Sequence, residues 1–167
     1  MTYAGFKCDL KEEPLSGRLI YRESEYSIDF VDCSREEIAL RTGGQGCCSL
    51  VIGTLQIEVG VETGRLLYPW GLCPLINCEP KHMPMNHIDC GSIYIESAGF
   101  ELVAGVAIEI PGSNLWQMFK DMATGWICIG DYDMGDKIRL VQFSKSAMIS
   151  LSDEVAIAVW IRPEVEL

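Results

Sequence analysis

The chain has 167 residues, which is about one domain and is long enough to bury a hydrophobic core. Its 24 Asp and Glu residues against 13 Lys and Arg give a net charge of -11, so the basic surface that nucleic-acid binding requires is missing. With 49% hydrophobic and 22% charged residues it differs from disordered chains. Because residues 1–10 form no apolar signal segment and no apolar run reaches about eighteen residues, we expect a soluble, cytoplasmic protein folded as a single domain, 1–167.

Short apolar runs bounded by Gly, Pro, Ser or Asp recur along the chain and predict β-strands. The first two runs are residues 18–22 and 26–31. In the second run Tyr26, Ile28 and Phe30 alternate with polar residues, so these three side chains are expected to face inward. The pair predicts a first hairpin.

A second hairpin is indicated between residues 49–61 and 65–68, because apolar and polar residues alternate through the first of these segments. The three residues Glu62, Thr63 and Gly64 lie between them. Glycine in the last of three loop residues suits the left-handed conformation that such a hairpin loop needs. This turn is therefore predicted to join two adjacent strands.

Helical signals are few. Ser34 and Glu37 have the spacing of a capping box, but the glycines that begin at Gly43 limit this segment to one short helical turn or another strand. The apolar residues of the segment Leu115–Met122 have helical spacing, and Gly125 provides a stop. We expect the one short helix of the chain there.

The rest of the chain consists of strand-like runs and one irregular segment. Residues 69–90 contain four prolines, which interrupt strand pairing, so we expect an irregular excursion there. The complete pattern predicts an all-β fold of about nine to eleven mainly antiparallel strands, arranged as a sandwich or barrel-like roll. The remaining predicted strands are residues 92–96, 102–110, 126–129, 137–143, 147–151 and 155–162.

Eight cysteines are present, and in a reducing compartment most of them are expected to be free thiols. The excursion gathers the residues with the most chemistry, which are Cys73, Cys78, His82, His87 and Cys90. Thiolate and imidazole are ligands of zinc, but this spacing lacks the C-x2-C pair that presets two sulfur ligands. We expect no metal and no cofactor, with zinc bound by these five residues as an alternative. A second alternative is a Cys90 nucleophile with His87 or His82 as base, oriented by Asp89.

The segment Asp131–Asp136 begins like a calcium loop, but Gly135 takes the fifth position and no glutamate lies near the twelfth. It is expected to be a solvated hairpin tip that concentrates negative charge. The glycines 43–46 lack the lysine of a phosphate-binding loop, and Tyr68, Trp70 and Leu72 are a candidate contact patch. The candidate partner-binding residues are Asp131, Tyr132, Asp133, Asp136, Asp153 and Glu154.

A small acidic β domain without catalytic motifs is expected to bind a cationic protein, because opposite charges speed association and fix the choice of partner. In this general character the chain resembles bacterial immunity proteins, which neutralise toxin domains such as nucleases in the producing cell. The resemblance implies a non-enzymatic toxin inhibitor; it is one of character, and the chain carries no motif of a particular immunity family. From charge and composition we expect no nucleic-acid or membrane partner, and we expect a monomer or dimer. The alternatives are a metal- or thiol-dependent enzyme centred on Cys73–Cys90, and a β barrel whose lumen binds a small apolar ligand.

Overall fold

The computed structural model describes residues 4–97 and 101–166. Within these residues the chain is mainly β-structure, with the α-helix α1 (Arg35–Thr42) and the 3-10 turns η1 (Leu75–Asn77) and η2 (Ser113–Leu115). This confirms the predicted all-β fold with one short helix. In the described part of the chain, no helix has the length and apolar character to cross a membrane.

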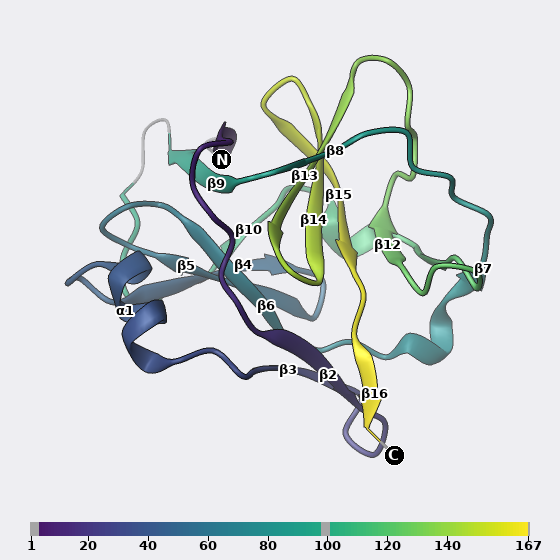
Figure 1. Cartoon of the computed structure of the whole chain (residues 1–167), viewed down its shortest axis with the longest axis horizontal. Coiled ribbons are helices and arrows are strands. Elements are labelled where there is room, and N and C mark those ends of the chain that lie inside the picture. The colour runs from purple at the N-terminus through teal and green to yellow at the C-terminus, as the bar shows by residue number, and fades with distance from the viewer. Residues whose placement is uncertain (1–3, 98–100, 167) are drawn as a thin grey trace.

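The first sheet contains both predicted hairpins, β2 with β3 and β5 with β6 (Figure 1). Gly64 has a φ of 76°, and its N–H donates to the Gly60 carbonyl at 2.8 Å, so the three-residue turn has the predicted left-handed glycine. In spatial order the strands are β10 (Ile108–Glu109), β4 (Cys47–Ile52), β5 (Leu55–Gly60), β6 (Leu66–Leu72), β3 (Ser27–Val31), β2 (Arg18–Arg22) and β16 (Glu164–Glu166).

The second sheet also has seven strands, and two further strands, β1 (Ala4–Asp9) and β9 (Ser92–Ser97), form a separate antiparallel ribbon. Four strands of the second sheet lie in the order β12-β15-β14-β13, which is a Greek key. The full spatial order is β7 (Glu79–Pro80), β11 (Met118–Lys120), β12 (Ile127–Gly130), β15 (Val155–Ile161), β14 (Ala147–Ser152), β13 (Ile138–Ser144) and β8 (Ile88–Cys90).

The two large sheets share one apolar core, to which Ile, Leu, Val and Phe side chains of both sheets contribute. The β1–β9 ribbon joins them at one side. Its Ile95 N–H donates to the Gly64 carbonyl of the first sheet at 2.8 Å, and its Phe6 N–H donates to the Glu154 carbonyl of the second at 2.9 Å. The arrangement is a sandwich closed at one side by the ribbon.

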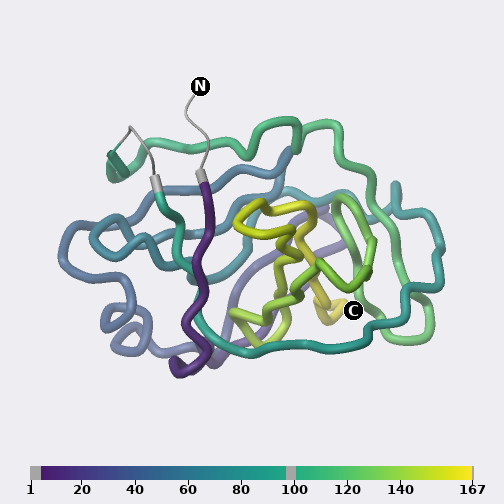
Figure 2. Tube along the Cα trace, turned by 90° about the horizontal axis from the view of Figure 1, so that it is seen from above, coloured from purple at the N-terminus to yellow at the C-terminus, as the bar shows by residue number. Residues whose placement is uncertain are grey.

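The outer face of the second sheet is covered as well. Residues 81–87, which we call the strap, connect β7 to β8 and run beside the yellow-green strands in Figure 2. Met83 and Met85 of the strap pack with Trp126 and Trp160 in a second apolar cluster. Because this sheet is buried on both faces, β14 is buried at five of its six positions instead of alternating.

Sixteen strands occur in the described residues, more than the nine to eleven expected, and eleven of them have four or more residues. The five short ones, β7, β8, β10, β11 and β16, lack the length that makes a strand recognisable in a sequence. All five take part in parallel pairs: β10, β8 and β16 each pair with a longer strand, at β10–β4, β13–β8 and β16–β2, and β7 and β11 pair with each other. The sheets are therefore mixed, with antiparallel long strands and parallel additions.

The predicted position of the helix was wrong. Residues 115–122 contain the end of η2 and the strand β11, because pairing of β11 with β12 overrides their helical spacing. The helix is α1, and Ser34 caps it: its Oγ accepts the Glu37 N–H at 3.1 Å. The Glu37 carboxylate does not complete the capping box and instead accepts the Ser16 N–H at 3.0 Å.

Three smaller predictions were also wrong. Tyr26 is 48% exposed because it lies in the β2–β3 turn with a φ of 52°. Only Ile108–Glu109 of the predicted strand 102–110 forms a strand, since a turn at Gly105, with a φ of 76°, interrupts it. The excursion starts after Leu72, not at Pro69. Pro69 can lie within β6 because β3 pairs with β6 only at Gly71 and Leu72, so the missing N–H of the proline interrupts no hydrogen bond to β3.

Candidate functional site

The acidic segment 131–137 connects β12 to β13, which are separated in the sheet by β15 and β14. The prediction of a hairpin tip was therefore wrong: the segment is the crossover of the Greek key. Asp131 starts it by donating its N–H to the Ile157 carbonyl at 2.9 Å. Gly130 makes this approach possible, since a Cβ at that position would lie 2.4 Å from the same carbonyl oxygen.

Carboxylates of the crossover also shape its backbone. Asp131 Oδ1 accepts the Asp133 N–H at 2.9 Å, and Asp133 Oδ1 accepts the Gly135 N–H at 3.0 Å. Both side chains and that of Asp136 remain exposed to solvent. The crossover is thus an ordered loop that presents three negative charges.

The second predicted acidic cluster lies beside this crossover. Asp153 and Glu154 form the two-residue turn between β14 and β15, and both are exposed. The crossover begins beside Ile157 and ends at Ile138, which pairs with Ser152, so it flanks this turn on both sides. In Figure 1 the crossover and the turn project from the same end of the second sheet.

We call these five carboxylates the acidic end. Within the described residues, none of them takes part in an ion pair. The nearby Lys7 is paired with Glu96 at 3.0 Å, and its pKa is raised mainly by this hydrogen bond and only to a smaller extent by the charge of Glu154. The acidic end therefore keeps a net negative charge, with its five carboxylates against Lys137 in the crossover itself. Its members are Asp131, Asp133, Asp136, Asp153 and Glu154.

An open hollow of about 470 Å³ adjoins the acidic end. Tyr132 forms one wall: its ring meets that of Phe119 edge to face, with centroids 4.9 Å apart, and Lys81 Nζ lies 5.0 Å from its centroid. Leu115 at the rim is 81% exposed. We call this the aromatic hollow, and its lining residues are Leu115, Trp116, Gln117, Phe119, Gly130, Asp131, Tyr132 and Asp133.

The structure thus brings together three of the predicted partner-binding residues with four that the sequence analysis did not select. Asp131, Tyr132 and Asp133 were predicted. Leu115, Trp116, Gln117 and Phe119 were missed, because their helical spacing assigned the apolar ones to a buried helix face.

The cysteines of the excursion are spread over different surroundings. Cys73 is 2% exposed, its Sγ lies 4.0 Å from Met118 Sδ, and burial raises its pKa to about 12. Cys78 is half-buried against the main core, whereas Cys90 is exposed with its Sγ 3.9 Å from Gln142 Oε1. A thiol with the raised pKa of Cys73 is a poor nucleophile at neutral pH.

The two histidines approach different carboxylates. His87 Nε2 lies 2.8 Å from Asp89 Oδ1, and His82 Nδ1 lies 3.8 Å from Asp121 Oδ2. Both imidazoles are more than four-fifths exposed. Across the described ranges, no group of three or more His, Cys, Asp or Glu side chains is arranged to hold a metal ion, so the proposed zinc ligands do not converge.

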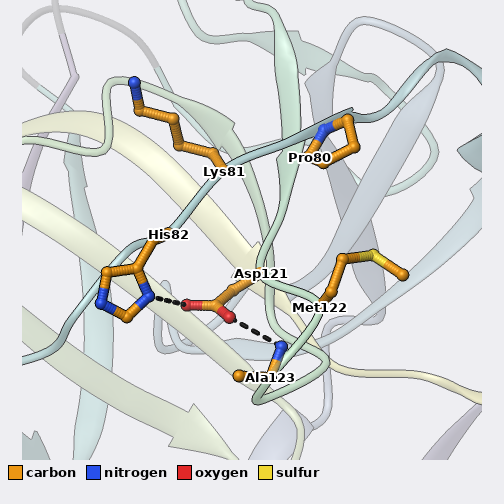
Figure 3. A pocket seen from close by; sticks show the side chains of 6 residues that line it. All are labelled: Pro80, Lys81, His82, Asp121, Met122 and Ala123. Carbon is orange, nitrogen blue, oxygen red and sulfur yellow. Dashed lines mark hydrogen bonds and ion pairs between the residues drawn. The ribbon is translucent and has the colours of Figure 1, made fainter.

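Figure 3 shows the hollow of about 340 Å³ beside His82 and Asp121. Asp121 is 2% exposed, and its carboxylate accepts the Met83 N–H at 3.0 Å and the Ala123 N–H at 2.9 Å. These backbone hydrogen bonds hold the pKa of Asp121 below its usual range. Its role is to fasten the strap to the turn after β11.

The predicted contact patch of the first sheet is only partly accessible. The Tyr68 ring stacks on Phe30 with centroids 4.3 Å apart, and burial raises the Tyr68 pKa to about 12. Trp70 is half-buried, and Leu72 is 46% exposed. Leu72 is thus less exposed than Leu115 at the rim of the aromatic hollow, which is 81% exposed.

Comparisons of the chain with protein-family models, with curated proteins and with solved structures found no match.

Proposed function

We propose that the chain binds a cationic protein through the acidic end and the aromatic hollow, and that it acts as an immunity-type inhibitor of a toxin domain in the cytoplasm. The observation that carries the proposal is the placement of five carboxylates without internal ion pairs on two adjacent loops, next to an apolar hollow. Nothing in this arrangement requires the protein to catalyse a reaction.

The carboxylates of the acidic end and the side chains of the aromatic hollow are expected to have different roles in such an interface. Unpaired carboxylates at one end of the molecule attract a basic partner over distances of about a Debye length, 8 to 10 Å at moderate salt, and so accelerate encounter. The affinity is expected to come from side chains buried in the hollow, since aromatic anchors dominate most interfaces. Lys81 Nζ already lies 5.0 Å from the Tyr132 ring centroid, so a lysine or arginine of the partner would have to replace it there.

The test begins with capture of partners from native extract and their identification by mass spectrometry, followed by association kinetics with the captured protein. The variant carries Asp131→Asn, Asp133→Asn and Asp136→Asn together. An asparagine Oδ1 still accepts a backbone hydrogen bond, so the loop keeps its two internal contacts. The variant therefore changes charge and leaves shape intact.

The matched control carries Glu23→Gln, Glu36→Gln and Glu109→Gln, three exposed residues in the β2–β3 turn, in α1 and in β10. Both triple variants lose three negative charges. We expect the first to slow association about tenfold at low salt, with the difference shrinking at moderate salt, and the control to stay within about twofold of wild type. Equal effects of the two variants would show that the acidic end is not the interface, and capture of no cationic protein would refute the proposed function.

A further inference from the structure

A third hollow, a cleft, opens between the two sheets at the end where the β4–β5 turn and η2 meet. Its volume is about 260 Å³. The side chains around it come from both sheets and from both 3-10 turns or their flanks. They are Ile52, Gly53, Thr54, Leu55, Cys73, Pro74, Asn77, Ser113, Asn114, Trp116, Met118 and Ile129.

The floor of the cleft is apolar and polarisable. Leu55 and Cys73 are each 2% exposed, and Ile129 is 5% exposed. Cys73 Sγ and Met118 Sδ lie 4.0 Å apart, so two sulfur atoms meet at the floor. Sulfur makes favourable contacts with aromatic rings, which makes this floor suited to a planar ring.

The rim supplies polar groups. Thr54 Oγ1 is already engaged, since it donates to the Leu72 carbonyl at 2.7 Å. Asn77 at the end of η1 and Asn114 in η2 are exposed, and neither side-chain amide makes a hydrogen bond to any residue that the structure describes. Two carboxamides from two different elements thus offer both donors and acceptors at the mouth of the cleft.

Charge is missing from this site. None of the twelve lining residues is charged, although the chain carries 37 charged residues with a net charge of -11. A charged ligand would lose its hydration here without gaining a counter-ion. The lining is therefore complementary to an uncharged molecule.

We infer that this cleft binds a small uncharged aromatic molecule, with its ring on the floor and an amide or hydroxyl group at the two asparagines. A volume of about 260 Å³ lies just below the range of about 300 to 1,000 Å³ in which drug-sized ligands bind, so the ligand has one or two rings. The inference does not rest on the proposed partner binding, because the groups that carry it are different ones, although the two sites adjoin and share Trp116.

The experiment is a two-dimensional NMR titration of the full chain with benzamide, phenol and indole. Saturable shifts are expected at the Trp116 indole N–H and at the Asn77 and Asn114 side-chain amides, with dissociation constants in the millimolar range. Benzoate, which has the shape of benzamide and a negative charge, is expected to bind at least about tenfold more weakly. If none of the three uncharged probes produces saturable shifts at the cleft, the inference is overturned.

Variants at the rim keep the test independent of folding, because both asparagines are exposed. Asn114→Ala and Asn77→Ala are each expected to weaken benzamide binding by about threefold, the effect of one neutral hydrogen bond. Asn86→Ala, in the exposed part of the strap, is the matched control and is expected to leave binding unchanged. Equal binding of benzamide and benzoate, or equal effects of the rim and control variants, would also overturn the inference.

Discussion

The strap offers a direct measurement of how the excursion is held on the second sheet. Met83 is 2% exposed and belongs to the apolar cluster that contains Trp126 and Trp160. Full burial of such a side chain is worth about 1.5 to 3 kcal/mol, and a cavity left beneath the strap adds to the loss. We expect Met83→Ala to lower the free energy of unfolding by about 3 kcal/mol.

Urea unfolding followed by tryptophan fluorescence measures this change, with the midpoint falling and the m-value unchanged. Met122→Ala is the matched control, because Met122 is 71% exposed and its truncation is expected to change stability by less than about 0.5 kcal/mol. The Met83 N–H, which donates to Asp121, should also exchange faster with solvent in Met83→Ala. Equal stability of the Met83 and Met122 variants would refute the packing of the strap.

Three further results are expected. Ser150→Ala leaves the buried Trp160 Nε1 without its acceptor at 2.7 Å and should cost about 1 to 3 kcal/mol in thermal unfolding, whereas the Ser150→Ala, Trp160→Phe double variant should lose less than the sum of the single changes. The folded-state pKa of Asp121 is lowered, so the contribution of its carboxylate to stability is present above the unfolded-state pKa and is lost as pH falls through the folded-state pKa. Hydrogen exchange in the strap of the wild type should therefore become faster at acid pH. The Asp121→Asn variant is the check, because it should not show this acid dependence. In thiol labelling of the native protein with peptide mapping, exposed Cys90 should react first, and Cys73, with a pKa of about 12, among the last; labelling of both at one rate would contradict the burial.

Part of the candidate site was recognisable in the sequence. Asp131, Tyr132 and Asp133 stood out because carboxylates and an aromatic ring gather in a turn-forming segment. Leu115, which is 81% exposed, and the half-buried Phe119 did not, because the exposure of an apolar residue has no local sequence signal. Both become part of the hollow only because β11 pairs with β12 instead of forming a helix.

Features determined by the sequence alone are those whose contacts are short in range. The β5–β6 hairpin follows from alternation and from Gly64, and the Ser34 cap follows from its spacing to Glu37, although α1, with 8 residues, is longer than the one short turn or strand predicted there. Tertiary structure alone decided that the 131–137 segment crosses the Greek key, that the strap covers the second sheet and that the two acidic loops adjoin. These arrangements depend on which strands pair although they are distant in the sequence. Such pairing is determined by the burial of whole sheet faces against one another, and a local sequence pattern does not contain that information.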